Sequence, residues 1–161
     1  MSTTATKELA AAVQLATDNV LKHGGPFGAL IVTADGQRFE GVNRVTANND
    51  PTAHAEVTAI RTACAALGTF DLSGATLYTS CEPCPMCLAS ALWARVSRVV
   101  FAADRHDAAS AGFDDAVFYD YFDKPETRSI MPVVREELEA GGPQPMDPFI
   151  TWNTLDSRID Y

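Results

Sequence analysis

Residues 52–57 read TAHAEV and residues 81–87 read CEPCPMC, and these two stretches decide the fold. Each lies where a loop or a strand end is expected to pass into a helix, since proline is tolerated in a first helical turn. Cys84 and Cys87, at i and i+3, lie on one face of that turn, where the helix dipole and free N–H groups favour the thiolate that zinc requires. With His54 at the start of the earlier helix, three ligands leave the fourth tetrahedral position to water, as in catalytic zinc sites.

Glu56 is the candidate proton carrier of this site. In the middle of a helix Glu56 and His54, two residues apart, would face in different directions. At the first turn the histidine can bind the metal while the carboxylate reaches over the bound water. Zinc lowers the pKa of such a water toward ~7, and Glu56 can take its proton and deliver it to a ring nitrogen and a leaving amine. The combined pattern, H-x-E…P-C-x-x-C, is typical of zinc deaminases.

The cysteines favour metal binding over a disulfide framework, because three of the four lie within seven residues. A structural zinc site, the main alternative, would need Cys81 as its fourth ligand. Cys81 precedes Pro83 at a strand end, and we expect its side chain to point elsewhere. Cys64, inside a helix, is expected in the core, whereas His23 and His106 stand in polar surroundings typical of the surface.

Outside the two motifs the sequence alternates between helices and strands. Apolar residues at helical spacing predict a first helix. Asp35-Gly36 predicts a hairpin turn between the two strands that follow this helix. The expected elements are a helix at 6–22, strands at 28–33 and 38–43, a helix at 53–67 ended by Gly68, a strand at 75–79, a helix from 83 to about 95, a strand at 96–103, a helix near 115–122, an extended piece near 130–134 and a helix near 148–159. The alternation predicts one domain over residues 1–161, an α/β fold built as a three-layer α/β/α sandwich with a mixed central sheet of about five strands.

Composition and charge favour a small-molecule enzyme. The 161 residues are 47% hydrophobic and 20% charged, which is ordinary for a globular protein with one core. The 12 lysines and arginines are scattered and the net charge is -9, unlike a protein that grips a phosphate backbone. We find no signal peptide and no apolar run near the ~20 residues of a membrane span. We therefore expect a cytoplasmic protein with no nucleic-acid or membrane partner.

The sequence resembles the cytidine-deaminase superfamily and, within it, guanine deaminases of the bacterial type. The resemblance is carried by GPFGA at 25–29, NNDPTAHAEVTAIR at 48–61, YTSCEPCPMCL at 78–88 and AGFDD at 111–115. The zinc motif is common to the superfamily, whereas AGFDD and the terminal Tyr161 are narrower signals. The resemblance implies a zinc-dependent aminohydrolase that converts guanine to xanthine and ammonia.

The resemblance also implies roles for residues around the substrate. Asn43 matches the asparagine that hydrogen-bonds the base, and Phe27 matches a ring that packs on the heterocycle. Asp115 matches a carboxylate that assists at the 2-amino group, with Asp114 as the alternative if the loop register differs. Tyr161 matches a C-terminal tyrosine that closes the pocket. A carboxylate suits guanine, because its 2-amino group and ring N–H groups are hydrogen-bond donors.

Two further residues and a C-terminal arm complete these expectations. Trp93, on the zinc helix, and Ala55 are expected to line the pocket, although a tryptophan there fits a core or an interface equally well. The hinge-like residues 141–143 precede an arm, residues 143–161, that carries apolar residues at spacings of three and four. The resemblance implies that two subunits can exchange such arms, and hence a homodimer.

Three alternatives remain open from the residues alone. Guanosine, cytosine, a pterin or a triazine such as ammeline could each fit a pocket of this kind. A tRNA adenosine deaminase shares the zinc motif, but the net charge of -9 and the lack of a basic C-terminal helix speak against it. The third alternative is a zinc-binding module without enzymatic activity.

Overall fold

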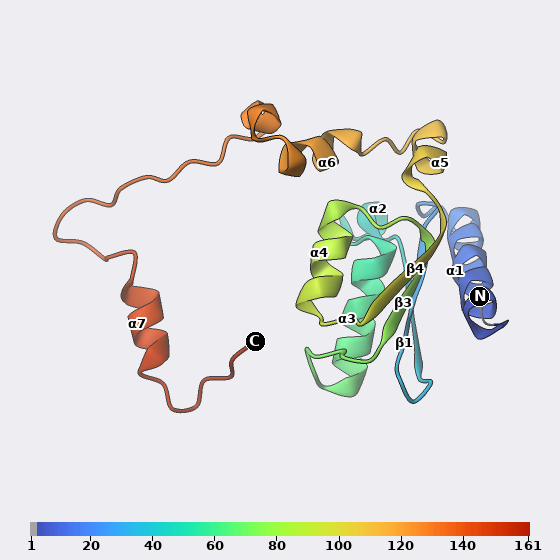
Figure 1. Cartoon of the computed structure of the whole chain (residues 1–161), viewed down its shortest axis with the longest axis horizontal. Coiled ribbons are helices and arrows are strands. Elements are labelled where there is room, and N and C mark those ends of the chain that lie inside the picture. Colours follow the sequence, from blue (N-terminus) through green and yellow to red (C-terminus); the bar gives the residue numbers. More distant parts are fainter. Residues whose placement is uncertain (1–2) are drawn as a thin grey trace.

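The computed structural model describes residues 3–161, which form a sheet with helices on both faces and a long C-terminal extension (Figure 1). The elements in chain order are α1 (Thr3–Leu21), β1 (Gly28–Val32), β2 (Arg38–Val42), α2 (Val45–Asn48), α3 (Ala55–Leu67), β3 (Thr76–Cys81), α4 (Pro85–Trp93), β4 (Arg98–Ala103), α5 (Arg105–Ser110), α6 (Ala116–Asp123), the 3-10 helix η1 (Pro125–Ile130) and α7 (Asp147–Asn153). Among these residues, no helix is both long and apolar enough to cross a membrane.

The central sheet is mixed and has the strand order β2-β1-β3-β4. β1 runs antiparallel to β2 and β3, whereas β3 and β4 are parallel. Because successive side chains of a strand point to opposite faces, Ala29 and Ile31 pack with α3, while Leu30 between them packs with α1. α1 therefore covers one face of the sheet and α3 with α4 covers the other, which confirms the predicted α/β/α sandwich.

The sheet has four strands within residues 3–161, so the expectation of about five strands is wrong by one. The piece expected to be extended, near 130–134, follows η1 and runs away from β4 (Figure 1). Val133 and Val134 are each 74% exposed. A strand is stabilised when its backbone groups pair with a neighbouring strand, and this extended segment has no such neighbour in the described part of its own chain.

The close packing of α3 against β2 fixes the position of the helix that carries His54 and Glu56. Gly41 of β2 makes this possible, because a side chain there would clash with backbone atoms of Ala55 and Ala59. At its other end the helix stops at Gly68, whose φ of 65° is left-handed, as the sequence predicts.

Several element ends differ from the expected ones. α3 and α4 begin at Ala55 and Pro85, two residues later than expected, because His54 and Cys84 are extended N-cap residues that precede the helices. The last helix, α7, ends at Asn153 rather than near residue 159. The short helices α2 and α5 were not expected from the sequence.

After β4 the chain leaves the sheet through α5 and α6. It then passes through η1 and α7 and returns so that its C-terminus lies on the α4 side of the body (Figure 1). Many large apolar side chains of this segment are exposed, namely Ile130, Met131, Val133, Val134, Leu138, Met146, Phe149, Ile150, Leu155 and Ile159. These side chains have no counterpart to pack against within the described residues of the same chain.

Candidate active site

Two helix N-termini converge to form a cluster of possible metal ligands. His54 is the N-cap residue of α3, and Cys84 is the N-cap residue of α4, one turn before Cys87. The His54 Nδ1 atom lies 3.6 Å from Cys84 Sγ and 3.5 Å from Cys87 Sγ. All three ligand atoms lie within 4.8 Å of one another. The structure therefore brings together the three residues that the sequence predicts as ligands.

The spacing of these atoms fits a tetrahedral zinc ion. Zn–S bonds of about 2.3 Å and Zn–N bonds of about 2.0 Å, set at the tetrahedral angle, place nitrogen and sulfur about 3.5 Å apart. Both nitrogen–sulfur distances in the cluster match this value. Because one histidine and two cysteines are ordinary zinc ligands, the donor set and its geometry agree.

Glu56 lies beside the ligand cluster, in the first turn of α3, and is 5% exposed. Its carboxylate accepts hydrogen bonds from the Thr79 hydroxyl at 3.2 Å and from the Cys87 thiol at 3.4 Å. Burial raises the pKa of Glu56. A proton held on this carboxylate is therefore less costly than in water, which suits a group that accepts and returns protons.

The electrostatics of the cluster favour a bound cation. Hydrogen bonding from Cys87 lowers the pKa of Cys84, while the same pairing and burial raise the pKa of Cys87. The pKa of His54 is raised, chiefly by its hydrogen bond to Cys84. Ionising the Cys87 thiol beside Cys84 and Glu56 would gather three negative charges in one buried site, and a divalent cation would offset their repulsion.

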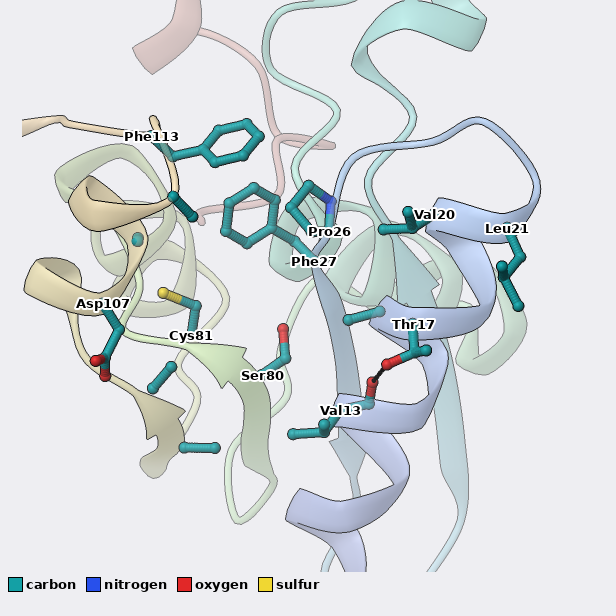
Figure 2. A pocket seen from close by; sticks show the side chains of 15 residues that line it. Val13, Thr17, Val20, Leu21, Pro26, Phe27, Ser80, Cys81, Asp107 and Phe113 are labelled. Atoms are coloured by element: carbon teal, nitrogen blue, oxygen red, sulfur yellow. Dashed lines mark hydrogen bonds between the residues drawn. The ribbon is translucent and has the colours of Figure 1, made fainter.

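Cys81 does not belong to the ligand cluster. Its side chain points into a hollow of about 470 Å³ on the α1 side of the sheet (Figure 2), and its Sγ lies 3.7 Å from the Asp104 carbonyl oxygen. Burial, with a contribution from the Glu56 charge, raises the pKa of Cys81 to about 11. Three protein ligands therefore remain, which is the number expected for a catalytic rather than a structural zinc site.

The structure also brings Asp115 toward the cluster. Asp115 is the residue before α6 and is partly buried. Its pKa is raised by burial and by the nearby Cys84. Asp114, in contrast, is exposed and accepts a hydrogen bond from the Ala116 N–H at 3.0 Å. Of the two candidate aspartates, Asp115 is therefore the one that is partly buried and whose charge interacts with that of Cys84.

Asn43 and Phe27 lie in adjoining segments, because the Asn43 N–H donates to the Phe27 carbonyl oxygen at 3.1 Å. The side-chain oxygen of Asn43 accepts from the Val45 N–H at 3.2 Å, so the amide nitrogen points the other way. The Phe27 ring meets Phe113 edge to face, with centroids 5.1 Å apart. Figure 2 shows this pair at the rim of the hollow described above.

Three other expected pocket residues are placed differently. Ala55, the first residue of α3, has its side chain fully buried in the core. Trp93 is 71% exposed and lies about 9 Å along α4 from Cys87, at 1.5 Å per residue. Tyr161 lies near Trp93 in a second hollow at that end of α4. Within one chain, neither Trp93 nor Tyr161 is brought to the ligand cluster.

Three residues near the site were not singled out from the sequence. Thr79 contacts Glu56, Tyr119 contacts the loop before Cys84 through the Pro83 carbonyl, and Arg105 stacks on Tyr119. Tyr119 and Arg105 belong to no short motif, whereas Thr79 lies within the YTSCEPCPMCL stretch at 78–88 but was given no role of its own. For Thr79, the position on the strand that leads to the cysteines was the only sign in the sequence that it lies near the site.

The fold and the ligand cluster define a class of protein. The chain belongs to the cytidine and deoxycytidylate deaminase family, whose zinc-binding region matches residues 2–103, and it is accordingly a zinc-dependent aminohydrolase. This confirms the predicted cofactor and reaction type.

Within that class, the chain is similar to guanine deaminases. The guanine deaminase of Bacillus subtilis strain 168 is 49% identical over 138 residues, which are 86% of each protein. An X-ray structure of guanine deaminase from Bacillus subtilis aligns with 100% of this chain and 99% of that chain, with 47% identity and a TM-score of 0.89. A guanine deaminase structure from Nitrosomonas europaea aligns with 66% of this chain and 63% of that one, with 35% identity and a TM-score of 0.63.

Similarity to RNA-modifying relatives covers less of the chain. The tRNA-specific adenosine deaminase of Agrobacterium fabrum is 45% identical over 78 residues, which are 48% of this chain and 51% of the relative. The shared zinc motif accounts for this kind of match.

Proposed function

We propose that this protein catalyses the hydrolytic deamination of guanine, in which guanine and water give xanthine and ammonia. The observation that carries the proposal is the place of Asp115 at the start of α6, a helix that the Tyr119–Pro83 hydrogen bond joins to the loop before Cys84. Asp115 lies outside residues 2–103, the segment that matches the family's zinc-binding region. The similarity to guanine deaminases extends over this additional segment, since the alignment with the Bacillus subtilis structure spans the whole chain.

The chemistry follows from the side chains around the cluster. When bound by His54, Cys84 and Cys87, zinc polarises a water molecule so that it can lose a proton near neutral pH. Glu56 would act twice. It accepts one proton from the water and gives it to a ring nitrogen of guanine, and it then passes the second proton of the water to the amine, which leaves as ammonia while the oxygen stays on xanthine. The burial of Glu56 keeps bulk water from competing for these protons.

The proposed substrate contacts hold the ring in place. Asp115 accepts a hydrogen bond from the 2-amino group, so that the leaving group is held beside the cluster. The amide nitrogen of Asn43 donates to an acceptor of the base, and the ring of Phe27 packs on the heterocycle. Such positioning matters for the rate, because a displacement of the reacting atoms by about 1 Å can lower the rate by about 10².

We also propose that two chains form a dimer by exchanging their C-terminal arms. The exposed apolar residues beyond α6 and the open edge of β4, where Phe101 is 42% exposed, support this arrangement. The TM-score of 0.89 over the whole chain supports a similar extended arm in the Bacillus subtilis protein. Tyr161 would then close the partner's pocket. Sedimentation equilibrium tests the dimer, and a mass of one chain, 17.3 kDa, would overturn it.

A cytoplasmic location is part of the same proposal. All four cysteines are free, which suits a reducing compartment. This is also where two zinc-ligating thiols would stay available.

The decisive experiment is ammonia release from a panel of amino-heterocycles by the zinc-loaded protein. The panel contains guanine, guanosine, cytosine, adenosine, a pterin, ammeline and a tRNA substrate. We expect the highest kcat/KM for guanine. A higher value for any other member would overturn the proposed substrate, and no ammonia from any member would overturn the assignment as a deaminase of these rings.

A further inference from the structure

Asp115 stands at the start of a helix that is weakly supported by the body of the protein. Three apolar side chains of α6 are about half exposed or more, namely Val117, Phe118 and Phe122. Figure 1 shows α6 beyond the end of the sheet, joined to the body through the α5 segment. A carboxylate that must meet substrate precisely enough for catalysis needs a firmer support than such a helix provides on its own.

Contacts on both sides of Asp115 supply that support. On the preceding side, Phe113 meets Phe27 edge to face. On the following side, the Tyr119 hydroxyl donates a hydrogen bond of 3.0 Å to the carbonyl oxygen of Pro83. Tyr119 is four residues after Asp115, so the two lie on one side of the helix start. The Pro83 carbonyl immediately precedes Cys84, a zinc ligand.

A third group joins α5 to the same place. The Arg105 guanidinium carbon lies 4.4 Å from the centre of the Tyr119 ring, within the range of a cation–π contact. The backbone N–H of Arg105 donates to the Glu82 carboxylate at 2.9 Å. The tyrosine is thus held by its ring on one side and by its hydroxyl group on the other.

We propose that Tyr119 is a positioning residue, which ties Asp115 to the loop that carries Cys84 through the hydrogen bond to the Pro83 carbonyl. The inference rests on the proposed role of Asp115 in guanine binding. On this proposal, the hydroxyl group of Tyr119 sets the distance between the Asp115 carboxylate and the metal ligands. The exposed helix α6 does not set that distance on its own.

The hydroxyl group keeps its proton under working conditions. Partial burial, together with the charges of Asp115 and Glu82, raises the pKa of Tyr119 to about 12. Tyr119 therefore remains a donor to the Pro83 carbonyl throughout the pH range in which a deaminase is assayed.

A double-mutant cycle tests the proposal in the full-length, zinc-loaded protein. Tyr119→Phe keeps the ring under Arg105 and removes only the hydroxyl group. Tyr121→Phe is the matched control, because Tyr121, on the same helix, donates to the Met131 carbonyl oxygen at 2.9 Å. Tyr119→Phe and Tyr121→Phe are first compared as single variants. Tyr119→Phe is then combined with Asp115→Asn, so that the double variant can be compared with each single variant. Zinc content and Tm are measured for every variant.

We expect Tyr119→Phe to lower kcat/KM for guanine about tenfold, as the loss of one hydrogen bond does, with zinc content unchanged and Tm lowered by no more than about 2–4 °C. Tyr121→Phe should stay within about twofold of the parent. In the Asp115→Asn background, Tyr119→Phe should cause no further loss, because residues that act through one contact are not additive.

Two results would overturn this inference while the proposed function stands. They are a Tyr119→Phe variant with parental kcat/KM, and a full additional loss in the double variant. A parent protein that releases no ammonia from guanine would instead overturn the proposed function, and Asp115→Asn with parental activity would overturn the role of Asp115. The inference about Tyr119 falls in both of those cases.

Discussion

The hydroxyl group of Thr79 lies 3.2 Å from the Oε1 atom of Glu56, and both side chains are buried. The same hydroxyl group lies 3.0 Å from the Cys81 carbonyl oxygen. A hydroxyl group has one hydrogen to donate and can also accept. It can therefore donate to Glu56 while the carboxylate is ionised. Once Glu56 is protonated, the Thr79 hydroxyl group can accept a hydrogen bond from the Glu56 carboxyl group and donate one to the Cys81 carbonyl oxygen.

Replacing Thr79 should impair catalysis without removing zinc. Thr79→Val has nearly the same shape but leaves Glu56 without its hydroxyl partner, so we expect kcat for guanine to fall about tenfold. Thr79→Ser keeps the hydroxyl group and should retain most of the activity. Steady-state kinetics and zinc analysis of both variants provide the measurement. Equal kcat values for the two variants would show that the hydroxyl group does not orient Glu56.

Glu56→Gln should keep the fold and the zinc and lose nearly all activity. The amide can neither accept the proton of the water nor return it, and general acid–base catalysis is typically worth about 10²–10⁴ in rate. Glu40→Gln, an exposed change on β2, is the control and should behave as the parent. The kcat of both variants is measured at saturating guanine. Activity of Glu56→Gln within tenfold of the parent would contradict its role.

Zinc binding should depend on Cys84 and not on Cys81. Cys84→Ala removes one of three ligands, so we expect less than one tenth of the parental zinc content and a Tm close to that of the chelator-treated parent. Cys81→Ala should retain full zinc, because the Cys81 thiol lies outside the ligand cluster. Metal analysis after gel filtration gives both values. Full zinc in the Cys84→Ala protein would refute the ligand assignment.

Asp115→Asn should reduce kcat/KM for guanine by about tenfold or more, since an amide is a weaker acceptor than a carboxylate for the 2-amino group. Asp114→Asn is the matched control. Its side-chain oxygen can still accept from the Ala116 N–H, as the Asp114 carboxylate does, so we expect little change. Kinetics of the two variants decide between the neighbouring aspartates. A larger loss for Asp114→Asn would reverse the assignment.

The zinc site could be predicted from the sequence because its geometry is local. Cys84 and Cys87 are related by a single helical turn, and His54 and Glu56 by the start of another. The strand and helix order then brings the two helix starts together. These relationships depend on spacing and on helix capping, both of which the sequence shows directly.

Contacts between distant residues could not be predicted in this way. The Tyr119–Pro83 hydrogen bond joins residues 36 positions apart, and no pattern near either residue announces it. The missing fifth strand also depends on contacts between distant residues. The composition of residues near 130–134 favours an extended backbone, but no strand of the described chain pairs with them. Trp93 was expected near the substrate because it shares α4 with Cys87, but it stands at the other end of that helix.

The last prediction concerns the chain end. Tyr161 is 77% exposed, and its ring meets Trp152 edge to face with centroids 6.5 Å apart. It contributes little to the core, so deleting Asp160 and Tyr161 should leave zinc content and Tm nearly unchanged. If Tyr161 closes a partner's pocket, the deletion should lower kcat/KM for guanine tenfold or more, an effect of the size that lid residues produce. Asp160→Ala is the control for changes in terminal charge.

Mixing two impaired variants then tests whether the tyrosine acts across the dimer. Full-length Glu56→Gln chains are unfolded and refolded together with chains that have Glu56 but lack Asp160 and Tyr161. With exchanged arms, each mixed dimer has one complete site, so random pairing should restore about a quarter of parental activity. Without exchange, every site lacks either Glu56 or Tyr161, and the mixture keeps only the residual activity of the truncated chains. Unchanged kinetics of the truncated protein alone would show that the chain end is not needed for guanine turnover.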